Sequence, residues 1–128
     1  MKFSLMITTR KRPVQLKQLI ESILKTTNNL NDIEMRIAFD NDDNISKKVL
    51  ASISNPHIFL HNRPRGNHLV AHYFNWLALN FCQGDFIIQT NDDCLFETQD
   101  WDIKTYNKLT EYLKDKPDRI VLQKNQHK

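Results

Sequence analysis

The sequence predicts an α/β protein built on an open, mostly parallel, twisted sheet with helices on both faces. Short apolar runs bounded by turn residues alternate with segments whose apolar residues recur at helical spacing. This β-α-β-α-β-α-β-α-β alternation is typical of parallel strands joined by right-handed helical crossovers. A chain of 128 residues fits one domain, so we expect residues 1–128 to form a single domain.

The first half of the chain contains two predicted strands and two predicted helices. Residues 2–9 carry an apolar run typical of a buried strand. Pro13 suits the first position of a helix, and the segment behind it has one apolar stripe. A second strand is predicted over 33–39, and a short helix over 45–53 follows it.

The second half continues the same alternation. A short strand is predicted over 57–61. The clearest helix spans 70–81, because its apolar residues recur at i, i+3, i+4, i+7, i+8 and i+11, and Gly84 is expected to end it. A strand over 85–90, a helix over 103–114 and a last strand over 119–122 complete the pattern.

Composition excludes several function classes. The two glycines, Gly66 and Gly84, leave no Gly-rich phosphate loop, so phosphates would be bound by a metal and side chains. Cys82 and Cys94 form no C-x-x-C pair and are interpreted as reduced structural thiols. A net charge of +3 is too mild to indicate a nucleic-acid partner, and no apolar run is long enough to span a membrane. We therefore expect a cytoplasmic protein.

Polar residues follow each of the first four predicted strands. They are Thr8-Thr9-Arg10, Asp40-Asn41-Asp42-Asp43, Asn62-Arg63-Pro64-Arg65 and Asn91-Asp92-Asp93. Ligands of open α/β sheets bind beyond the carboxyl ends of the strands. We therefore expect these four clusters to line one edge of the sheet and to form the binding site.

The mixture of carboxylates and guanidiniums at this edge indicates a metal-bridged diphosphate. Adjacent carboxylates repel each other unless a cation lies between them, and a hard divalent ion with oxygen ligands would relieve that repulsion. Such an ion also takes ligands from substrate phosphates. The arginines suit bidentate contacts with phosphate oxygens. Asp43 is the exception, because its place before a predicted helix favours a role as N-cap.

Three segments resemble the GT-A type glycosyltransferases, particularly family 2-like members. "SLMITTRKRP" looks like that family's first strand and nucleotide loop, and "MRIAFDNDD" like its second strand, whose terminal Asp contacts uracil or ribose. "NRPRGNHLVAHYFNWLALNFCQGDFIIQTNDDC" resembles the block that ends in the metal-binding DxD. The resemblance implies a Rossmann-like GT-A fold and a metal-dependent glycosyltransferase that uses a UDP-sugar. We expect UDP-glucose as the donor because it is a common one.

The resemblance also implies roles for individual residues. The candidates for nucleotide binding are Thr8, Thr9, Arg10, Asp40, Asp42, Arg63, Arg65 and Asp92. Among them, Thr8, Asp40 and Asp42 would hold the uridine, and the arginines would bind the pyrophosphate. The candidate ligands for Mn²⁺ or Mg²⁺ are Asp93, Asp92 and His127. Asp92 either shares the metal or faces the ribose.

The sequence departs from the family pattern in two places. Asn91 stands where the first Asp of DxD is expected. Family members also continue for about as many residues again, so the acceptor-binding half is expected to be largely absent. No catalytic base is assigned, although Glu97, Asp100 and Asp102 lie in the right region. A missing base favours a retaining mechanism. Hydrolysis of the donor by water is an alternative reaction. A homodimer that completes the site is a further alternative.

Two other function classes remain as alternatives. A nucleotidyltransferase shares the nucleotide-and-metal geometry but usually needs a Gly-rich first loop, which this sequence lacks. A non-catalytic nucleotide-sugar-binding module needs only the binding residues. Trp101 is expected to pack in the core, with stacking on a sugar as the alternative. The sequence names no acceptor.

Overall fold

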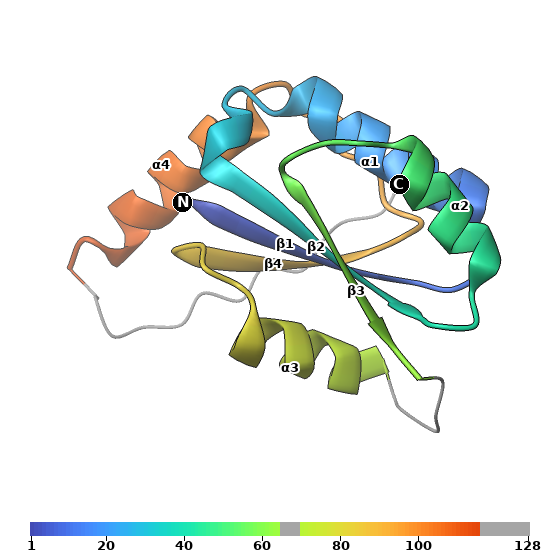
Figure 1. Ribbon diagram of the computed structural model, residues 1–128. Coiled ribbons are helices and arrows are strands. Elements are labelled where there is room, and N and C mark those ends of the chain that lie inside the picture. The colour runs from blue at the N-terminus through green and yellow to red at the C-terminus, as the bar shows by residue number, and fades with distance from the viewer. Residues whose placement is uncertain (65–69, 116–128) are drawn as a thin grey trace.

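A computed structural model describes residues 1–64 and 70–115 of the chain (Figure 1). Four parallel strands form one sheet in the order β3-β2-β1-β4. The strands are β1 (Phe3–Thr9), β2 (Ile33–Asp40), β3 (Ile58–Arg63) and β4 (Phe86–Asn91). The helices are α1 (Pro13–Thr26), α2 (Asn44–Ser52), α3 (Val70–Asn80) and α4 (Trp101–Leu113), and a 3₁₀ turn (Leu30–Asp32) precedes β2.

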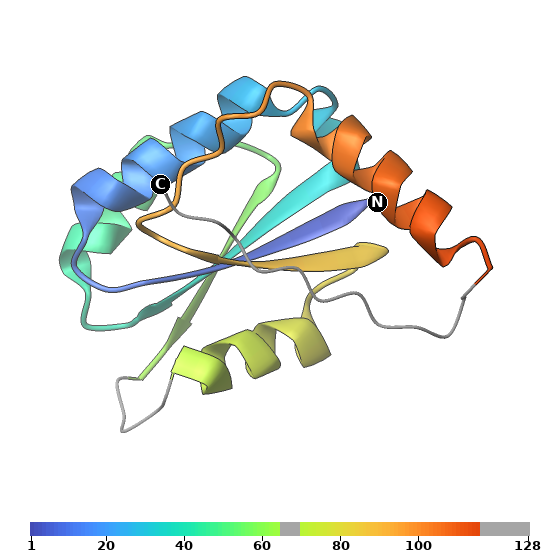
Figure 2. The same ribbon diagram turned by 180° about the vertical axis from the view of Figure 1, so that it is seen from behind.

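The helices lie on both faces of the sheet, as the sequence predicts. Figures 1 and 2 show α1, α2 and α4 on one face and α3 on the other. The α/β class with a parallel open sheet is therefore confirmed. Within the two described ranges, no helix has the length and apolar character needed to cross a membrane.

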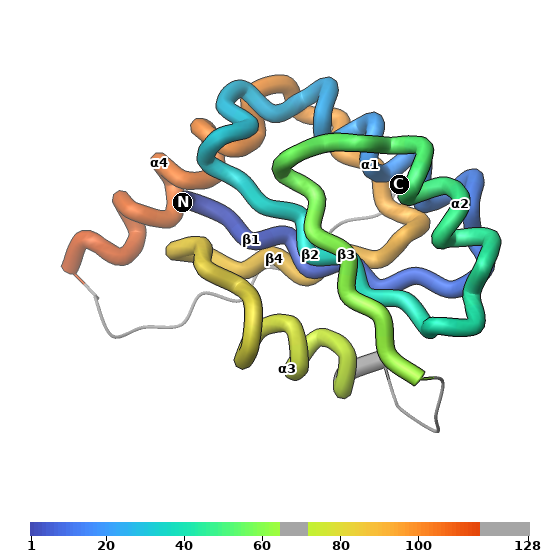
Figure 3. Tube along the Cα trace, in the orientation of Figure 1, coloured from blue at the N-terminus to red at the C-terminus, as the bar shows by residue number. Residues whose placement is uncertain are grey.

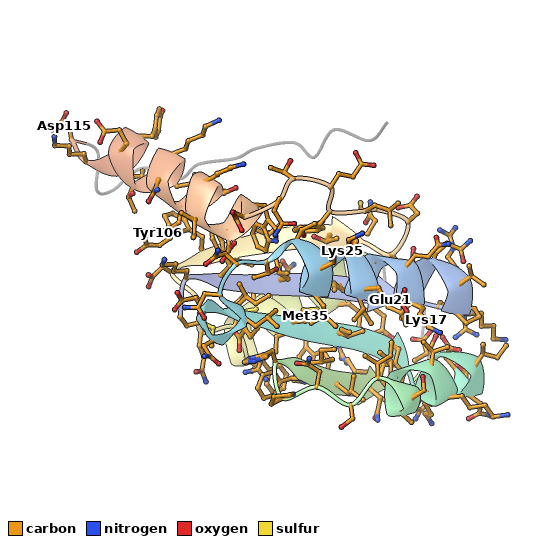
Figure 4. All side chains as sticks on the ribbon, turned by 90° about the horizontal axis from the view of Figure 1, so that it is seen from above. Lys17, Glu21, Lys25, Met35, Tyr106 and Asp115 are labelled. Atoms are coloured by element: carbon orange, nitrogen blue, oxygen red, sulfur yellow. The ribbon has the colours of Figure 1, made fainter. Side chains whose placement is uncertain are left out.

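The larger core lies between the sheet and α1. Successive side chains of a strand point to opposite faces, so alternate residues of β1 and β2 meet the apolar stripe of α1. The side chains fully buried there are Phe3, Leu5, Ile7, Leu16, Leu19, Ile20, Ile23, Ile33, Met35 and Ile37. Each such burial stabilises the fold by roughly 1.5–3 kcal/mol relative to an exposed side chain. The outer side of α1 is polar, as the labels on Lys17, Glu21 and Lys25 in Figure 4 show.

A smaller core lies between the sheet and α3. Met6 and Ala38 point to this face and pack against Phe74 and Leu77 of α3. This cluster fixes α3 across the face of β1 and β2. Because α3 begins beyond the carboxyl end of β3, its first turns lie beside the edge where the polar clusters gather.

Two boundaries differ from the sequence-based expectation. β3 was expected to end at His61, but it continues to Arg63 because Asp40 and Arg63 are paired across β2 and β3. The backbone N–H of Asn41 also donates to the carbonyl of Arg63 at 2.8 Å. Helix α3 ends at Asn80, well before Gly84. The predicted strand over 119–122 lies outside the described residues.

Gly84 has a packing role instead of ending a helix. A Cβ at this position would lie 2.5 Å from the backbone N of Ser4 and 2.6 Å from the carbonyl carbon of Phe3. The backbone N–H of Gly84 donates to the Ser4 hydroxyl at 2.7 Å. Only glycine permits this approach of the chain to β1 just before β4 begins.

Beside Gly84, a buried ion pair between Glu34 and Arg36 of β2 lies on the α3 face, and the Ser4 hydroxyl links it to β1. Glu34 is 1% exposed, and its carboxylate accepts from the hydroxyl of Ser4, from the backbone N–H of Gln83 at 2.7 Å and from Arg36. Burial alone would raise the pKa of Glu34, but these hydrogen bonds outweigh burial and hold its pKa below the ordinary value. The pair lies away from the polar clusters at the carboxyl ends.

Candidate functional site

The described residues of the four polar clusters converge on one edge of the sheet. All four strands are parallel, so their carboxyl ends lie together, on the right in Figure 1. Across the strands, Asp40 pairs with Arg63 and Thr8 pairs with Asn91. The geometric expectation that Asp40, Arg63 and the Asn91-Asp92-Asp93 cluster share one side is therefore confirmed. We call this edge the carboxyl rim.

Arg10 joins two carboxylates of the carboxyl rim. Its NH1 lies 2.6 Å from Oδ2 of Asp40 and 2.9 Å from Oδ1 of Asp42. The hydrogen bond with Asp42, followed by the contact with Asp40, raises the pKa of Arg10 further above its ordinary value. The sequence predicts a pyrophosphate contact for Arg10, whereas in this structure its guanidinium neutralises the two aspartates after β2. That pairing holds the loop after β1 against the loop after β2.

Asp40 is also held from α3 by Tyr73. The Tyr73 hydroxyl donates to Oδ1 of Asp40, and Asp40 is only 7% exposed. Partial burial, together with the Asp40 carboxylate, raises the pKa of Tyr73 to about 12. The sequence does not predict this contact, because Tyr73 belongs to the apolar stripe of the predicted helix. The sequence signal that could have indicated the contact is the Tyr73 hydroxyl, a polar group in the first turns of an otherwise apolar stripe.

Arg63 lies beside Tyr73 and stacks on aromatic rings. Its guanidinium carbon is 4.8 Å from the ring centre of Trp76 and 5.8 Å from that of Tyr73. Such cation–π contacts orient a guanidinium while leaving its N–H groups available to an anion. Arg65, the second arginine expected here, lies outside the described residues.

Asp92 and Asp93 differ sharply in their surroundings. Asp92 is 7% exposed, and its two oxygens accept from Thr9 Oγ1 at 3.0 Å and from Arg12 NH1 at 3.3 Å. Asp93 is exposed to solvent. A buried carboxylate that accepts two hydrogen bonds suits a fixed binding contact, whereas an exposed carboxylate suits a metal ion shared with a ligand.

Asp43 caps α2, which confirms its expected role. Its Oδ1 accepts from the backbone N–H of Ser46 at 3.1 Å, and its Oδ2 accepts from the backbone N–H of Lys11 at 2.8 Å. Burial alone would raise the pKa of Asp43, but these bonds and the Ser46 hydroxyl hold its pKa below the ordinary value. Lys11 has a positive φ of 51°, so the Asp43 carboxylate fastens a turn that few side chains favour.

The candidates for a catalytic base lie away from the carboxyl rim, which corrects the sequence-based expectation. Figure 3 shows the chain after β4 running back along α1 toward α4. Along this path the backbone N–H of Phe96 donates to Ser22 in the second half of α1, one residue before the exposed Glu97. Asp100 then contacts the end of α1, since its N–H donates to Thr26.

Asp102 and Trp101 are structural residues at the opposite edge of the sheet. Asp102 is 1% exposed, and its carboxylate accepts from the backbone N–H groups of Asn28 and Asn29 at 2.9 and 3.0 Å. Trp101 is 6% exposed and donates its indole N–H to Thr27 at 2.9 Å, so it packs in the core and does not stack on a sugar. These contacts fix the start of α4 against the end of α1.

Among the described residues of the carboxyl rim, Asp93 offers an exposed carboxylate to a metal ion. In the two described ranges, no group of three or more His, Cys, Asp or Glu side chains is arranged to hold a metal ion. Asp93 is an exposed oxygen donor, and divalent ions such as Mg²⁺ commonly complete their shell with substrate phosphates and water. His127, the third expected ligand, lies outside the described residues.

The chain has a GT-A type fold, the fold that the sequence resemblance implied. No family model matches the sequence, and no curated protein matches it either. Similarity was found instead among solved structures. At 14–16% identity these matches show the fold alone.

Structures of S. aureus TarS are among the matches. The crystal structure of TarS 1–349 gives a TM-score of 0.71 at 16% identity and covers 88% of this chain and 33% of that chain. TarS 1–349 in complex with UDP-GlcNAc gives 0.66 at 14% identity, covering 88% and 32%. Its complex with UDP gives 0.63 at 16% identity, covering 96% and 38%. The present chain therefore spans about a third of TarS 1–349.

Proposed function

We propose that this chain is a metal-dependent glycosyltransferase that binds a UDP-sugar at the carboxyl rim. The observation that carries the proposal is the meeting of Asp40, Arg63 and Asp92 at one edge of a GT-A type sheet. The UDP and UDP-GlcNAc complexes of TarS 1–349, which has the same fold, support a uridine nucleotide as the ligand.

The uridine would lie against the ends of β1 and β2. Asp40, with Thr8 and Asp42 beside it, offers carboxylate acceptors to the N–H and O–H groups of a nucleoside. Arg10 stabilises these carboxylates through its ion pairs, so its proposed role moves from the pyrophosphate to the nucleoside side of the site. Arg63, oriented by the ring of Trp76, is then the described arginine best placed for the diphosphate.

Asp93 would hold Mn²⁺ or Mg²⁺ near the end of β4. Asp92 is already bonded through both oxygens, so we assign it to the ribose or to support of the metal site. When bound, the metal neutralises charge that develops on the leaving diphosphate. Asp93 and Arg63 would then stabilise the same diphosphate from two sides, one through the metal and one directly.

The residues of the carboxyl rim bind and orient the donor but include none of the three proposed bases. Asp102 is tied to backbone N–H groups at the opposite edge, and Glu97 and Asp100 lie along the path to it. We therefore propose either a retaining transfer, in which no protein base is strictly needed, or hydrolysis of the donor by water. A second copy of the chain would be one source of an acceptor side.

A panel of UDP-sugars that includes UDP-glucose and UDP-GlcNAc, assayed with Mn²⁺ for UDP release, tests the activity. Calorimetry with UDP, with and without Mn²⁺, tests binding separately. Turnover with Mn²⁺ supports the enzyme, and binding without turnover supports the nucleotide-sugar-binding module. Tighter binding of ATP or CTP than of UDP would favour the nucleotidyltransferase. Failure to bind UDP at all would exclude the proposal, and light scattering during the assay tests the homodimer.

A further inference from the structure

We propose that Tyr73 is a positioning residue that orients Asp40 toward uracil and so sets a preference for uridine over cytidine nucleotides. The inference rests on the proposed function and deepens it by naming the residue that controls base selection. Tyr73 lies on α3, outside all four polar clusters that the sequence analysis assigned to the site.

Asp40 is held by one donor on each of its two carboxylate oxygens. Tyr73 donates its hydroxyl to Oδ1, and Arg10 donates NH1 to Oδ2 at 2.6 Å. Each carboxylate oxygen therefore accepts from one protein donor. The two donors approach Asp40 from different sides, Tyr73 from α3 and Arg10 from the loop after β1. A carboxylate has about four acceptor positions, so Asp40 keeps capacity for a ligand N–H while its orientation is fixed.

Uracil and cytosine differ in the hydrogen-bonding groups on their base edges. Uracil carries a donor N–H at N3, whereas cytosine carries a bare acceptor nitrogen at the same position. An ionised carboxylate only accepts hydrogen bonds, so a carboxylate that faces position 3 binds the N–H of uracil and repels the lone pair of cytosine there. Sites built around a buried hydrogen-bonding group reject analogues that cannot complete the bond much more strongly than apolar pockets do.

The two donors, Tyr73 and Arg10, differ in how firmly they fix the Asp40 carboxylate. Arg10 is shared with the exposed Asp42, so its guanidinium has two competing partners. Tyr73 stands on a helix anchored by Phe74 and Leu77, which are 3% and 0% exposed. With a pKa near 12, the phenol keeps its proton at neutral pH and remains a donor. Tyr73 is therefore the better-anchored partner of Asp40.

The test compares the affinities of UDP and CDP for the full chain and for Tyr73→Phe, measured by calorimetry with Mn²⁺. The substitution keeps the ring that contacts Arg63 and removes only the hydroxyl. We expect UDP affinity to fall about tenfold and CDP affinity to change much less, so that the UDP/CDP ratio falls. An unchanged ratio in Tyr73→Phe, or an equal loss for both nucleotides, would overturn the inference.

The matched control is Tyr106→Phe, since Tyr106 also donates its hydroxyl to an aspartate, Asp85, at 3.3 Å. Tyr106 belongs to α4, and Figure 4 shows it away from the α1 end that carries Lys17. The control should leave both affinities unchanged.

Asp40→Asn provides a second measurement. In that background, Tyr73→Phe should no longer change the UDP/CDP ratio, because the partner carboxylate is gone. A Tyr73→Phe effect that persists in Asp40→Asn would contradict the inference. If the wild-type chain binds no UDP, the proposed function fails and the inference fails with it. If the wild-type chain binds UDP and Tyr73→Phe keeps the wild-type ratio, only the inference fails.

Discussion

Thr9 and Asp92 join the carboxyl ends of β1 and β4 through one buried hydrogen bond, from Thr9 Oγ1 to Asp92 Oδ2 at 3.0 Å. With Arg12 on its other oxygen, Asp92 is a fixed part of the carboxyl rim. Asp93, the next residue, is exposed. Two adjacent aspartates therefore have separable roles, which stability and binding measurements can distinguish.

Asp93→Asn should abolish the effect of Mn²⁺ on UDP affinity while changing the free energy of unfolding by less than about 0.5 kcal/mol, because an exposed side chain contributes little to stability. Asp92→Asn should instead destabilise the fold by about 1–3 kcal/mol, because it disturbs a buried carboxylate with two donors. Calorimetry with and without Mn²⁺ and urea unfolding of both variants check this. A Mn²⁺ effect that survives in Asp93→Asn would move the metal to another residue.

Asp43 should contribute stability that depends on pH. Its pKa in the folded chain is held below the ordinary value of 3.8, so the folded state binds fewer protons than the unfolded state. The contribution is present above that value and is lost as the pH falls through it toward the folded pKa. Urea unfolding of the wild type and of Asp43→Ala between pH 7 and pH 3 measures it.

The loss at pH 7 should be about 0.5–2 kcal/mol for Asp43→Ala, the usual cost of removing an N-cap, and the gap between the two proteins should narrow at low pH. Asp43→Asn is the matched control, since an amide oxygen can still cap α2. Its loss should be smaller. An equal gap between wild type and Asp43→Ala at pH 7 and pH 3 would show that the charge of Asp43 is unimportant.

The pKa of the Tyr73 phenol should depend on the charge of Asp40 even when no nucleotide is bound. Burial and the Asp40 carboxylate raise the pKa of Tyr73 to about 12. Asp40→Asn removes the negative charge, so the pKa of Tyr73 should fall toward its ordinary value near 10. Titration of tyrosine ring signals by NMR measures this change. An unchanged value for Tyr73 would mean that Asp40 does not perturb the phenol.

The sequence predicted the parallel sheet and the carboxyl rim because both follow from local patterns. Strand ends such as Asp40 and Asp92 are marked by polar residues after apolar runs, and parallel pairing then brings those ends together. The contact of Tyr73 with Asp40 joins residues 33 positions apart, and a helical stripe gives no sign of which member faces a carboxylate. Such contacts depend on where α3 crosses the sheet.

Long connections also explain the misplaced catalytic candidates. Asp100 and Asp102 follow the Asn91-Asp92-Asp93 cluster closely in sequence, which suggested proximity in space. The connection instead runs along α1, and Asp102 binds the backbone of Asn28, 74 residues earlier in the chain. The end of β3 also depends on a contact that is distant in sequence. The pairing of Arg63 with Asp40 extends this strand beyond His61.

Gly84→Ala should destabilise the fold without altering the binding site. The added Cβ would lie 2.5 and 2.6 Å from backbone atoms of β1, which cannot rotate away as a side chain can. Overpacking of this kind typically costs 1–3 kcal/mol. Gln83→Ala, at the exposed neighbouring position, is the control and should be nearly neutral.

Because Gly84 precedes β4 and the carboxyl rim follows it, the fraction of Gly84→Ala that folds should bind UDP with wild-type affinity. Urea unfolding and calorimetry on the same preparation check both points, and a Gly84→Ala protein as stable as wild type would contradict the close approach to Ser4.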